Sequence, residues 1–215
     1  MRLHRALAAA AAAAVALALA GAAPARQESA LWSLLEGGRW DELRGRGPAV
    51  VPELAALYRA TPEPGDRARI AQAFYVLGWP SEEAAEALFA DAGTAHRDLR
   101  LQVQWALGRV SSDDRVVDYL LASLVRGDDL LIRDKAACAL ASDQIHLSPE
   151  QRLRLLTRVV DLLESPEPWT RWTALRVLQT QTGQDKGFGP KAPDPERAAA
   201  VARWRRWLDE FRAQL

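Results

Sequence analysis

The sequence predicts an all-α fold, an α-α superhelix of about four helix pairs with a cap at each end. Three observations lead to this prediction. One short pattern recurs as the second helix of a pair, proline and glycine separate the helices, and no segment alternates polar and apolar residues as a strand does. The three clear copies of the pattern cover residues 99–108, 132–141 and 170–179, and a weaker copy covers 69–78.

The helices are expected in three successive regions. Residues 26–48 should form an N-terminal cap of short helices, in which Trp32 and Trp40 cover the open end of the core. Residues 49–182 should form the helix pairs, and residues 183–215 a loop followed by a C-terminal cap helix. The helices of the pairs are predicted to begin near Ala49, Asp66, Ser81, Arg97, Ser111, Asp129, Ser148 and Trp169.

Two helix starts carry recognisable capping residues. Ser148, Pro149 and Gln151 combine a capping serine, a proline at the first helical position and a side-chain acceptor at the third. Asp194 is expected to cap the last helix, with Pro195 at its first position.

The spacing between copies is that of stacked helix pairs. The equivalent leucines Leu77, Leu107, Leu140 and Leu178 are 30, 33 and 38 residues apart. One helix pair cannot bury its apolar face alone, so pairs with this period stack on one another.

The residues of these copies resemble a known family. Residues 132–140 read Ile-Arg-x-x-Ala-Ala-x-Ala-Leu and are similar to the second helix of HEAT and HEAT-like repeats, and Pro52 matches the proline in the first helix of such repeats. The resemblance covers roughly residues 49–181. It implies that Arg100, Arg133 and Arg171 pair with acids of the turns between helices. The acids available for such pairs are Asp98, Asp128, Asp129 and Glu167.

The first 25 residues have the features of a signal peptide. Arg2 and Arg5 precede an uncharged run over 6–20, and Ala23 and Ala25 stand at the −3 and −1 positions of a cleavage site. The alternative is an uncleaved anchor, because residues 6–25 could span a bilayer at about 1.5 Å per residue. The segment from 182 to 207 also resembles the ending of exported bacterial HEAT-repeat proteins. A periplasmic or secreted location is therefore expected.

Composition excludes several classes of function. The chain has 28 basic and 28 acidic residues, so no overall field favours binding to nucleic acid or to an anionic membrane. Cys138 is the single cysteine, which excludes an intramolecular disulfide and any zinc site built from several cysteines. A membrane association is expected only through an uncleaved N-terminal segment.

The sequence contains no motif of a hydrolase, a metalloprotease or a phosphate-binding loop. After residue 25 the only histidines are His96 and His146, which fall in different helix pairs. A catalytic dyad or a two-histidine metal site needs both side chains together. Neither a cofactor nor a metal is therefore expected.

One row of side chains predicts a binding surface. The third, seventh and eleventh positions of each second helix share the side that faces away from the alanine and leucine core. In the resembling family this side is concave. Exposed aromatic rings there would anchor a protein or a peptide. The alternative is that the rings pack between neighbouring helices. The candidate residues are Tyr75, Trp79, Leu101, Trp105, Asp134, Trp172 and Arg176.

The predicted function is that of an exported, non-catalytic scaffold or protein-binding module. Two alternatives stay open: an enzyme on a HEAT scaffold, lyase-like or metal-dependent, and a structural subunit of a larger envelope assembly. Within the same row, Cys138 either fills space as alanine would or forms a mixed disulfide with a partner. The 183–194 loop is a second possible binding element.

Overall fold

The computed structural model describes residues 30–144 and 146–215 of the chain. These ranges contain eleven α-helices, one π-helical and one 3₁₀ segment, and no strand, so the all-α prediction is confirmed for them. None of the helices in these ranges has the length and apolar character needed to cross a bilayer. The signal segment predicted at 1–25 lies outside the described residues, as do residues 26–29 of the expected N-terminal cap.

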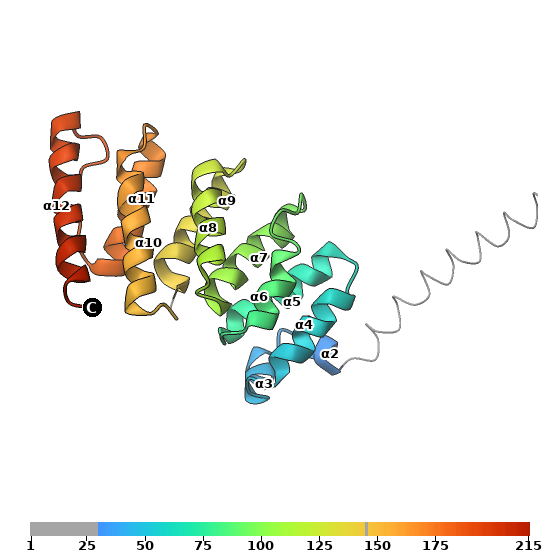
Figure 1. The fold of residues 1–215 in the computed structure, drawn as a ribbon. Coiled ribbons are helices and arrows are strands. Elements are labelled where there is room, and N and C mark those ends of the chain that lie inside the picture. Colours follow the sequence, from blue (N-terminus) through green and yellow to red (C-terminus); the bar gives the residue numbers. More distant parts are fainter. Residues whose placement is uncertain (1–29, 145) are drawn as a thin grey trace, which may run out of the picture.

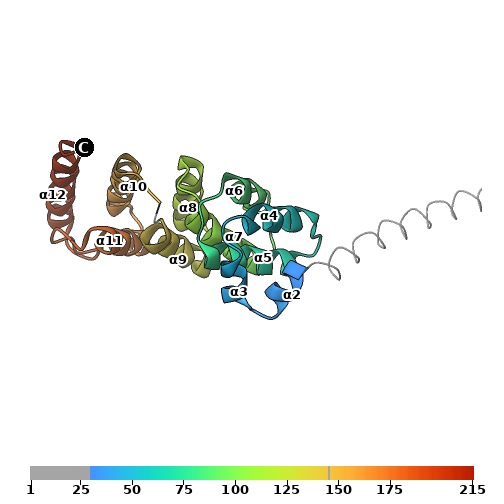
Figure 2. The ribbon, with the colours of Figure 1, turned by 90° about the horizontal axis from the view of Figure 1, so that it is seen from below.

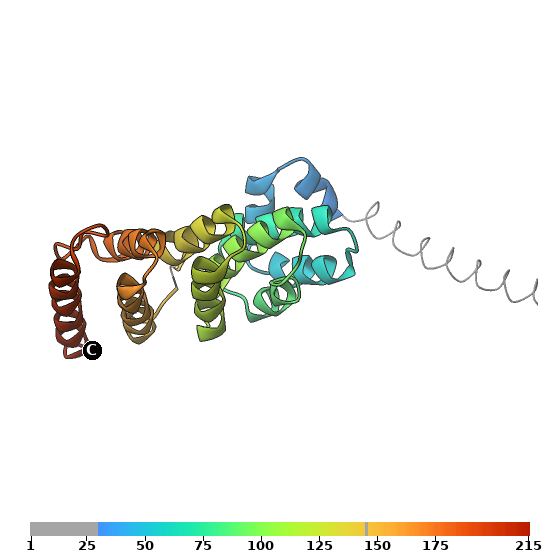
Figure 3. The ribbon, with the colours of Figure 1, turned by 90° about the horizontal axis from the view of Figure 1, so that it is seen from above.

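From α4 to α11 the helices alternate along the chain between two rows (Figure 1). The views from below and from above show the same two rows edge-on, with the first helices of the pairs on one side and the second helices on the other (Figures 2 and 3). This arrangement is compatible with an α-helical superhelix. The first row comprises α4 (Val50–Ala60), α6 (Glu82–Phe89), α8 (Asp114–Arg126) and α10 (Pro149–Asp161). The second row comprises α5 (Pro64–Leu77), α7 (Arg97–Val110), α9 (Leu130–Cys138) and α11 (Pro168–Thr182).

Both ends of the stack carry additional helices. Two short helices, α2 (Ala30–Glu36) and α3 (Trp40–Gly45), pack against α5, and Arg44 donates a 3.3 Å hydrogen bond to the Val76 carbonyl. Trp32 is buried and Trp40 is partly buried against the core. At the other end, α12 (Asp194–Arg212) packs against α10 and buries Trp204 completely.

Several helix starts are those that the sequence predicts. The Ser81 hydroxyl accepts the backbone N–H of Ala84 at 3.1 Å and caps α6. Ser148 and Gln151 form a complete capping box at α10, with Pro149 at the first helical position. Each cap satisfies a backbone donor that the first helical turn leaves unpaired.

Other predicted starts were displaced by a few residues. Helix α8 is capped by Asp113 and not by Ser111, because the Asp113 carboxylate accepts the Arg115 N–H at 2.8 Å. Helices α5 and α11 each begin at a proline, Pro64 and Pro168, two residues and one residue before the expected start. At α12, Asp194 is the first helical residue, so Pro195 follows at the second position.

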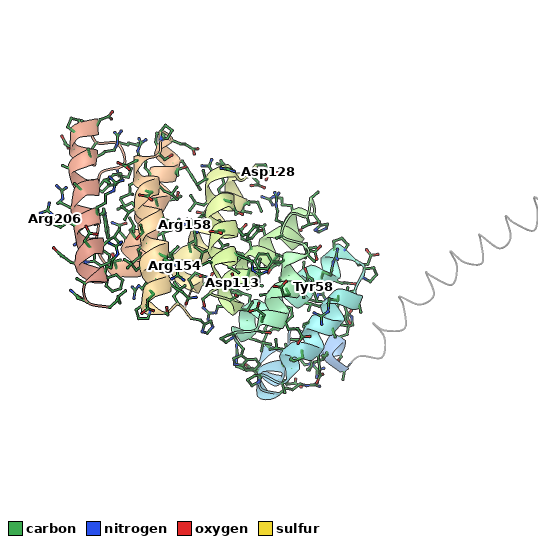
Figure 4. All side chains as sticks on the ribbon, in the orientation of Figure 1. Tyr58, Asp113, Asp128, Arg154, Arg158 and Arg206 are labelled. Carbon is green, nitrogen blue, oxygen red and sulfur yellow. The ribbon has the colours of Figure 1, made fainter. Side chains whose placement is uncertain are left out.

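Exposed ion pairs join neighbouring helices along the first row and join its last helix, α10, and the short segment after it to α12. The carboxylates of Asp114 and Asp118 on α8 pair with Arg154 and Arg158 on α10. Figure 4 labels both arginines. Exposed pairs of this kind contribute about 0–1 kcal/mol each, so they favour one alignment of the helices more than they add stability. The pairs are Arg59 with Glu83, Arg115 with Glu82 and Glu86, Arg154 with Asp114, Arg158 with Asp118, and Arg205 with Asp161 and Glu164.

The second row is joined by amide side chains that bond to the backbone of a neighbouring helix. Gln104 on α7 donates to the Ile132 carbonyl of α9 at 2.9 Å, and Gln144 donates back to the Gly108 carbonyl at 2.7 Å. Gln181 on α11 donates to the Leu140 carbonyl at 3.0 Å. Because these partners are backbone groups, the links set the position of one helix against the next.

Two of the three arginines singled out in the sequence pair with acids of the following turn. Arg100 lies 2.7 Å from Asp128, and Arg133 makes a bidentate pair with Glu167 at 2.9 and 2.5 Å. The expectation was wrong for Arg171, which donates to the carbonyls of Ser165, Pro166 and Pro190. That arginine therefore joins α11 to the loop before α12.

The Arg133 pair is set into a closely packed turn. The Arg133 guanidinium lies 4.4 Å from the centre of the Trp169 ring, and its Nε donates to the Leu124 carbonyl at 2.9 Å. A Cβ on Gly127 would stand 2.7 Å from the Cγ of Arg133, so this position requires glycine. Hydrogen bonds from Arg133 and then from Thr170 lower the pKa of Glu167 to about 2.

We predict that replacing Glu167 by alanine destabilises the fold. The side chain of Arg133 is only 11% exposed, so losing its partner leaves a nearly buried charge unpaired. We expect Glu167→Ala to lower the free energy of unfolding by about 1–3 kcal/mol in urea titrations followed by circular dichroism. The control is Glu164→Ala, since Glu164 pairs with the exposed Arg205. Equal losses in the two variants would contradict the role given to Arg133.

The same pair predicts a pH dependence of stability. The pKa of Glu167 is about 2 in the folded chain and near its ordinary value of 4.5 in the unfolded chain. The unfolded state therefore binds more protons between these values, and the stabilisation is lost as the pH falls from about 4.5 towards 2. We expect the stability difference between the parent and Glu167→Gln to be smaller at about pH 3 than at about pH 6. A difference that does not change with pH would contradict this assignment.

Candidate functional site

All the predicted site residues except Trp79 lie on the second row of helices. Tyr75 is near the end of α5, Trp105 is on α7, Asp134 is on α9, and Trp172 and Arg176 are on α11. Their helices are neighbours in the row, in the order α5, α7, α9, α11 (Figure 2). We call the connected side chains on this side the second-helix strip, which consists of Tyr75, Trp105, Asp134, Lys135, Trp172 and Arg176.

Two aromatic rings begin the strip. The ring centres of Tyr75 and Trp105 are 6.0 Å apart, with an angle of 33° between their planes. This spacing is typical of a favourable aromatic pair. The Nζ of Lys135 lies 5.4 Å from the centre of the Trp105 ring and carries the strip from α7 onto α9.

A charged group continues the strip from α9 to α11. The Asp134 carboxylate lies 2.9 Å from Arg176 and 3.7 Å from the ammonium of Lys135. The Arg176 guanidinium also stands 5.1 Å from the centre of the Trp172 ring, and Trp172 is 50% exposed. The strip therefore ends at an exposed aromatic ring held by a cation.

Two predicted residues do not join the strip. Leu101 is only 8% exposed, so it contributes almost nothing to an accessible surface, and its assignment to the binding face was wrong. Trp79 follows the end of α5 and packs against the core as a partly buried side chain. The packing alternative thus describes Leu101, Trp79 and also Tyr75, which packs against the core while it contacts Trp105, whereas it does not describe the half-exposed Trp172.

Three charged residues at this face were not named among the candidates, although Arg109 is the eleventh position of its copy in the same row. Lys135 follows Asp134 directly in the second-helix pattern and could have been found from that position. Arg109 stands 5.8 Å from the centre of the Tyr75 ring, and its Nη1 is 3.6 Å from the buried Asp143. Asp143 belongs to the π-helical segment η1 (Ala139–Asp143), which continues α9. A π-helical turn is rare, and the helical periodicity on which the prediction was based does not anticipate one.

Burial changes the proton affinity of the groups around Tyr75. Desolvation raises the pKa of the Tyr75 hydroxyl, and the nearby Asp143 raises it further. Desolvation also raises the pKa of Asp143, which the Arg109 charge partly offsets.

The single cysteine, Cys138, lies beside one residue of the strip. Arg176 approaches the sulfur of Cys138 to 3.6 Å, and the side chain is partly buried.

His96 and His146 each contact a backbone group, and they lie apart from one another. His96 caps α7 by accepting the Leu99 N–H at 3.3 Å, and His146 contacts the Gly78 carbonyl at 3.0 Å. Among residues 30–144 and 146–215, no group of three or more His, Cys, Asp or Glu side chains is arranged to hold a metal ion.

Two other surface features were considered as sites. A shallow hollow of about 390 Å³ beside α3 is lined by Arg39, Trp40 and Arg44 together with Asp41 and Glu42, which pair with the two arginines. The 183–194 loop is fastened to the fold, because Arg203 donates to the Lys186 carbonyl at 2.7 Å and Phe188 is buried. Neither feature offers an exposed aromatic ring comparable to Trp172.

No family model, no curated protein and no solved structure matches this chain. The candidate site is therefore defined by its own contacts.

The strip predicts a graded response of stability to loss of tryptophan. Trp204 is fully buried, Trp105 is partly buried and Trp172 is half exposed. We expect Trp204→Ala to cost about 3–5 kcal/mol, Trp105→Ala less, and Trp172→Ala the least, at about 1–2 kcal/mol. Urea unfolding of the three variants tests this order. If Trp172→Ala cost as much as Trp204→Ala, the ring would be a core residue and not part of an accessible surface.

Proposed function

We propose that this protein is an exported, non-catalytic scaffold that binds a protein partner through the second-helix strip of a HEAT-like superhelix. The partner is proposed to present an extended peptide segment, which lies across α7, α9 and α11. The observation that carries the proposal is the continuous chain of contacts from Tyr75 through Trp105, Lys135 and Asp134 to Arg176 and the half-exposed Trp172.

The composition of the strip supports binding to a partner. A solvated helix face is typically polar, whereas this face has aromatic rings in contact with cations. Aromatic residues and arginine are the residue types that contribute most to the stability of protein interfaces. The rings also lie on rigid helices, which lowers the entropic cost of binding.

The export part of the proposal rests on residues 1–25 of the sequence, with their basic start, apolar run and small residues at the cleavage site. The non-catalytic part rests on the chemistry of the strip, in which Asp134 is paired with two cations and the histidines are engaged with the backbone. A stoichiometric metal in the purified protein would contradict the non-catalytic part.

The proposal predicts that partner capture depends on Trp172. We expect the parent protein to retain a partner from envelope and secreted fractions and Trp172→Ala to lose it, as measured by quantitative mass spectrometry of the captured proteins. Trp172 suits this test because its half-exposed ring is the aromatic side chain of the strip whose loss should disturb the fold least.

The matched control is Trp207→Ala on α12, where the tryptophan is also partly buried and lies near a lysine, Lys186. We expect the control to retain the partner, provided that both variants have the helicity of the parent. If Trp172→Ala and the control capture the same partner equally well, the strip is not the binding surface. Loss in both variants would likewise contradict the proposal.

A further inference from the structure

The charges of the strip are unequal once their contacts are counted. Lys135 and Arg176 share one carboxylate, that of Asp134, and their side chains are 29% and 32% exposed. Arg109 adds a third cation beside the strip, and its partner Asp143 is buried. The accessible part of the strip therefore presents more positive than negative charge, although the chain as a whole is balanced.

Apolar contacts lie on both sides of this charge. The pair of Tyr75 and Trp105 stands on the α5 and α7 side, and Trp172 stands on α11. Lys135 belongs to α9, which lies between α7 and α11 in the row (Figure 2). A ligand that follows the row thus meets aromatic rings, then cations, then an aromatic ring.

The spacing of the helices sets the length of such a ligand. Neighbouring packed helices are separated by about 8–10 Å, so Trp105 and Trp172 are about 16–20 Å apart along the row. An extended peptide advances about 3.3 Å per residue. Five or six residue intervals therefore separate the two aromatic positions, and an acidic side chain near the middle would reach Lys135 and Arg176.

We propose that the strip recognises an extended peptide segment of about six or seven residues that carries an acidic side chain between two apolar ones. The acidic group pairs with Lys135 and Arg176, and the apolar side chains lie on the Trp105 ring and on the Trp172 ring. The inference rests on the proposed function and adds the chemistry of the partner. Two partly buried cations, Lys135 and Arg176, favour a ligand with a negative charge over a neutral or basic one.

The test begins with a phage-displayed library of random heptapeptides selected on the purified full-length protein. We expect selected sequences to have Asp or Glu near the centre and large apolar residues towards both ends. Selection of sequences with central Lys or Arg would overturn the inference.

Synthetic peptides from the selection then allow a charge-swap measurement by fluorescence anisotropy. We expect replacement of the central acid by its amide to weaken binding about 3- to 10-fold, and more at low salt than at high salt. Lys135→Glu should weaken binding of the acidic peptide and improve binding of the same peptide with a central Lys. The matched control is Lys186→Glu, because Lys186 stands 5.5 Å from the Trp207 ring much as Lys135 stands beside Trp105.

The outcomes separate this inference from the proposed function. If selected peptides need Trp172 but respond equally to Lys135→Glu and Lys186→Glu, the acidic specificity is wrong and peptide binding at the strip stands. If no selected peptide depends on Trp172, both proposals fail. If binding is restored when the peptide carries Lys and the protein carries Lys135→Glu, the two side chains pair directly.

Discussion

The close approach of the helices in the second row is the constraint on which the rest of the structure depends. A Cβ on Gly108 of α7 would stand 3.0 Å from the Cβ of Ala139, so a larger residue there would push the two helices apart. Buried amides then connect neighbouring helices to one another, as Gln144 does when it donates to the Gly108 carbonyl at 2.7 Å. Side chains of successive helices in the row also reach each other, as Arg176 of α11 does when it pairs with Asp134 of α9 at 2.9 Å.

The aromatic rings of the strip are held in place before any partner arrives. Arg109, Lys135 and Arg176 each stand within 6 Å of the centre of a ring, over Tyr75, Trp105 and Trp172 in that order. A cation over an aromatic face contributes about 0.5–1 kcal/mol at an exposed site and restricts both side chains. The side chains of the strip are therefore already held in place in the free protein, and a ligand would not need to order them.

The sequence predicted most of the helices because their ends depend on local chemistry. Ser81 and Ser148 cap helices through their own side chains, and such signals can be read from a few consecutive residues. The acid that pairs with Arg133 was also within reach, since Glu167 stands in the next turn of the pattern. Arg171 differs because its partners are backbone carbonyls, two in the turn before α11 and one, that of Pro190, in the loop before α12.

The candidate site was predicted in part for the same reason. Helical spacing correctly placed Trp105, Asp134 and Arg176 on one side of their helices, because that geometry is local. It did not distinguish the exposed Trp172 from the buried Leu101, because exposure depends on what neighbouring helices cover. The contacts between helices are long-range, and a single sequence records them only indirectly.

The ion pairs of the first row have a direction. From α6 onwards, the earlier helix supplies the acids and the later helix the arginines, so α8 faces α6 with Arg115 and faces α10 with Asp114 and Asp118. A helix with opposite charges on its two sides is complementary to a copy of itself. A tandem duplication of the segment from α8 to η1 would therefore bring unlike charges together at the new junction, which leaves this architecture able to grow longer by internal duplication.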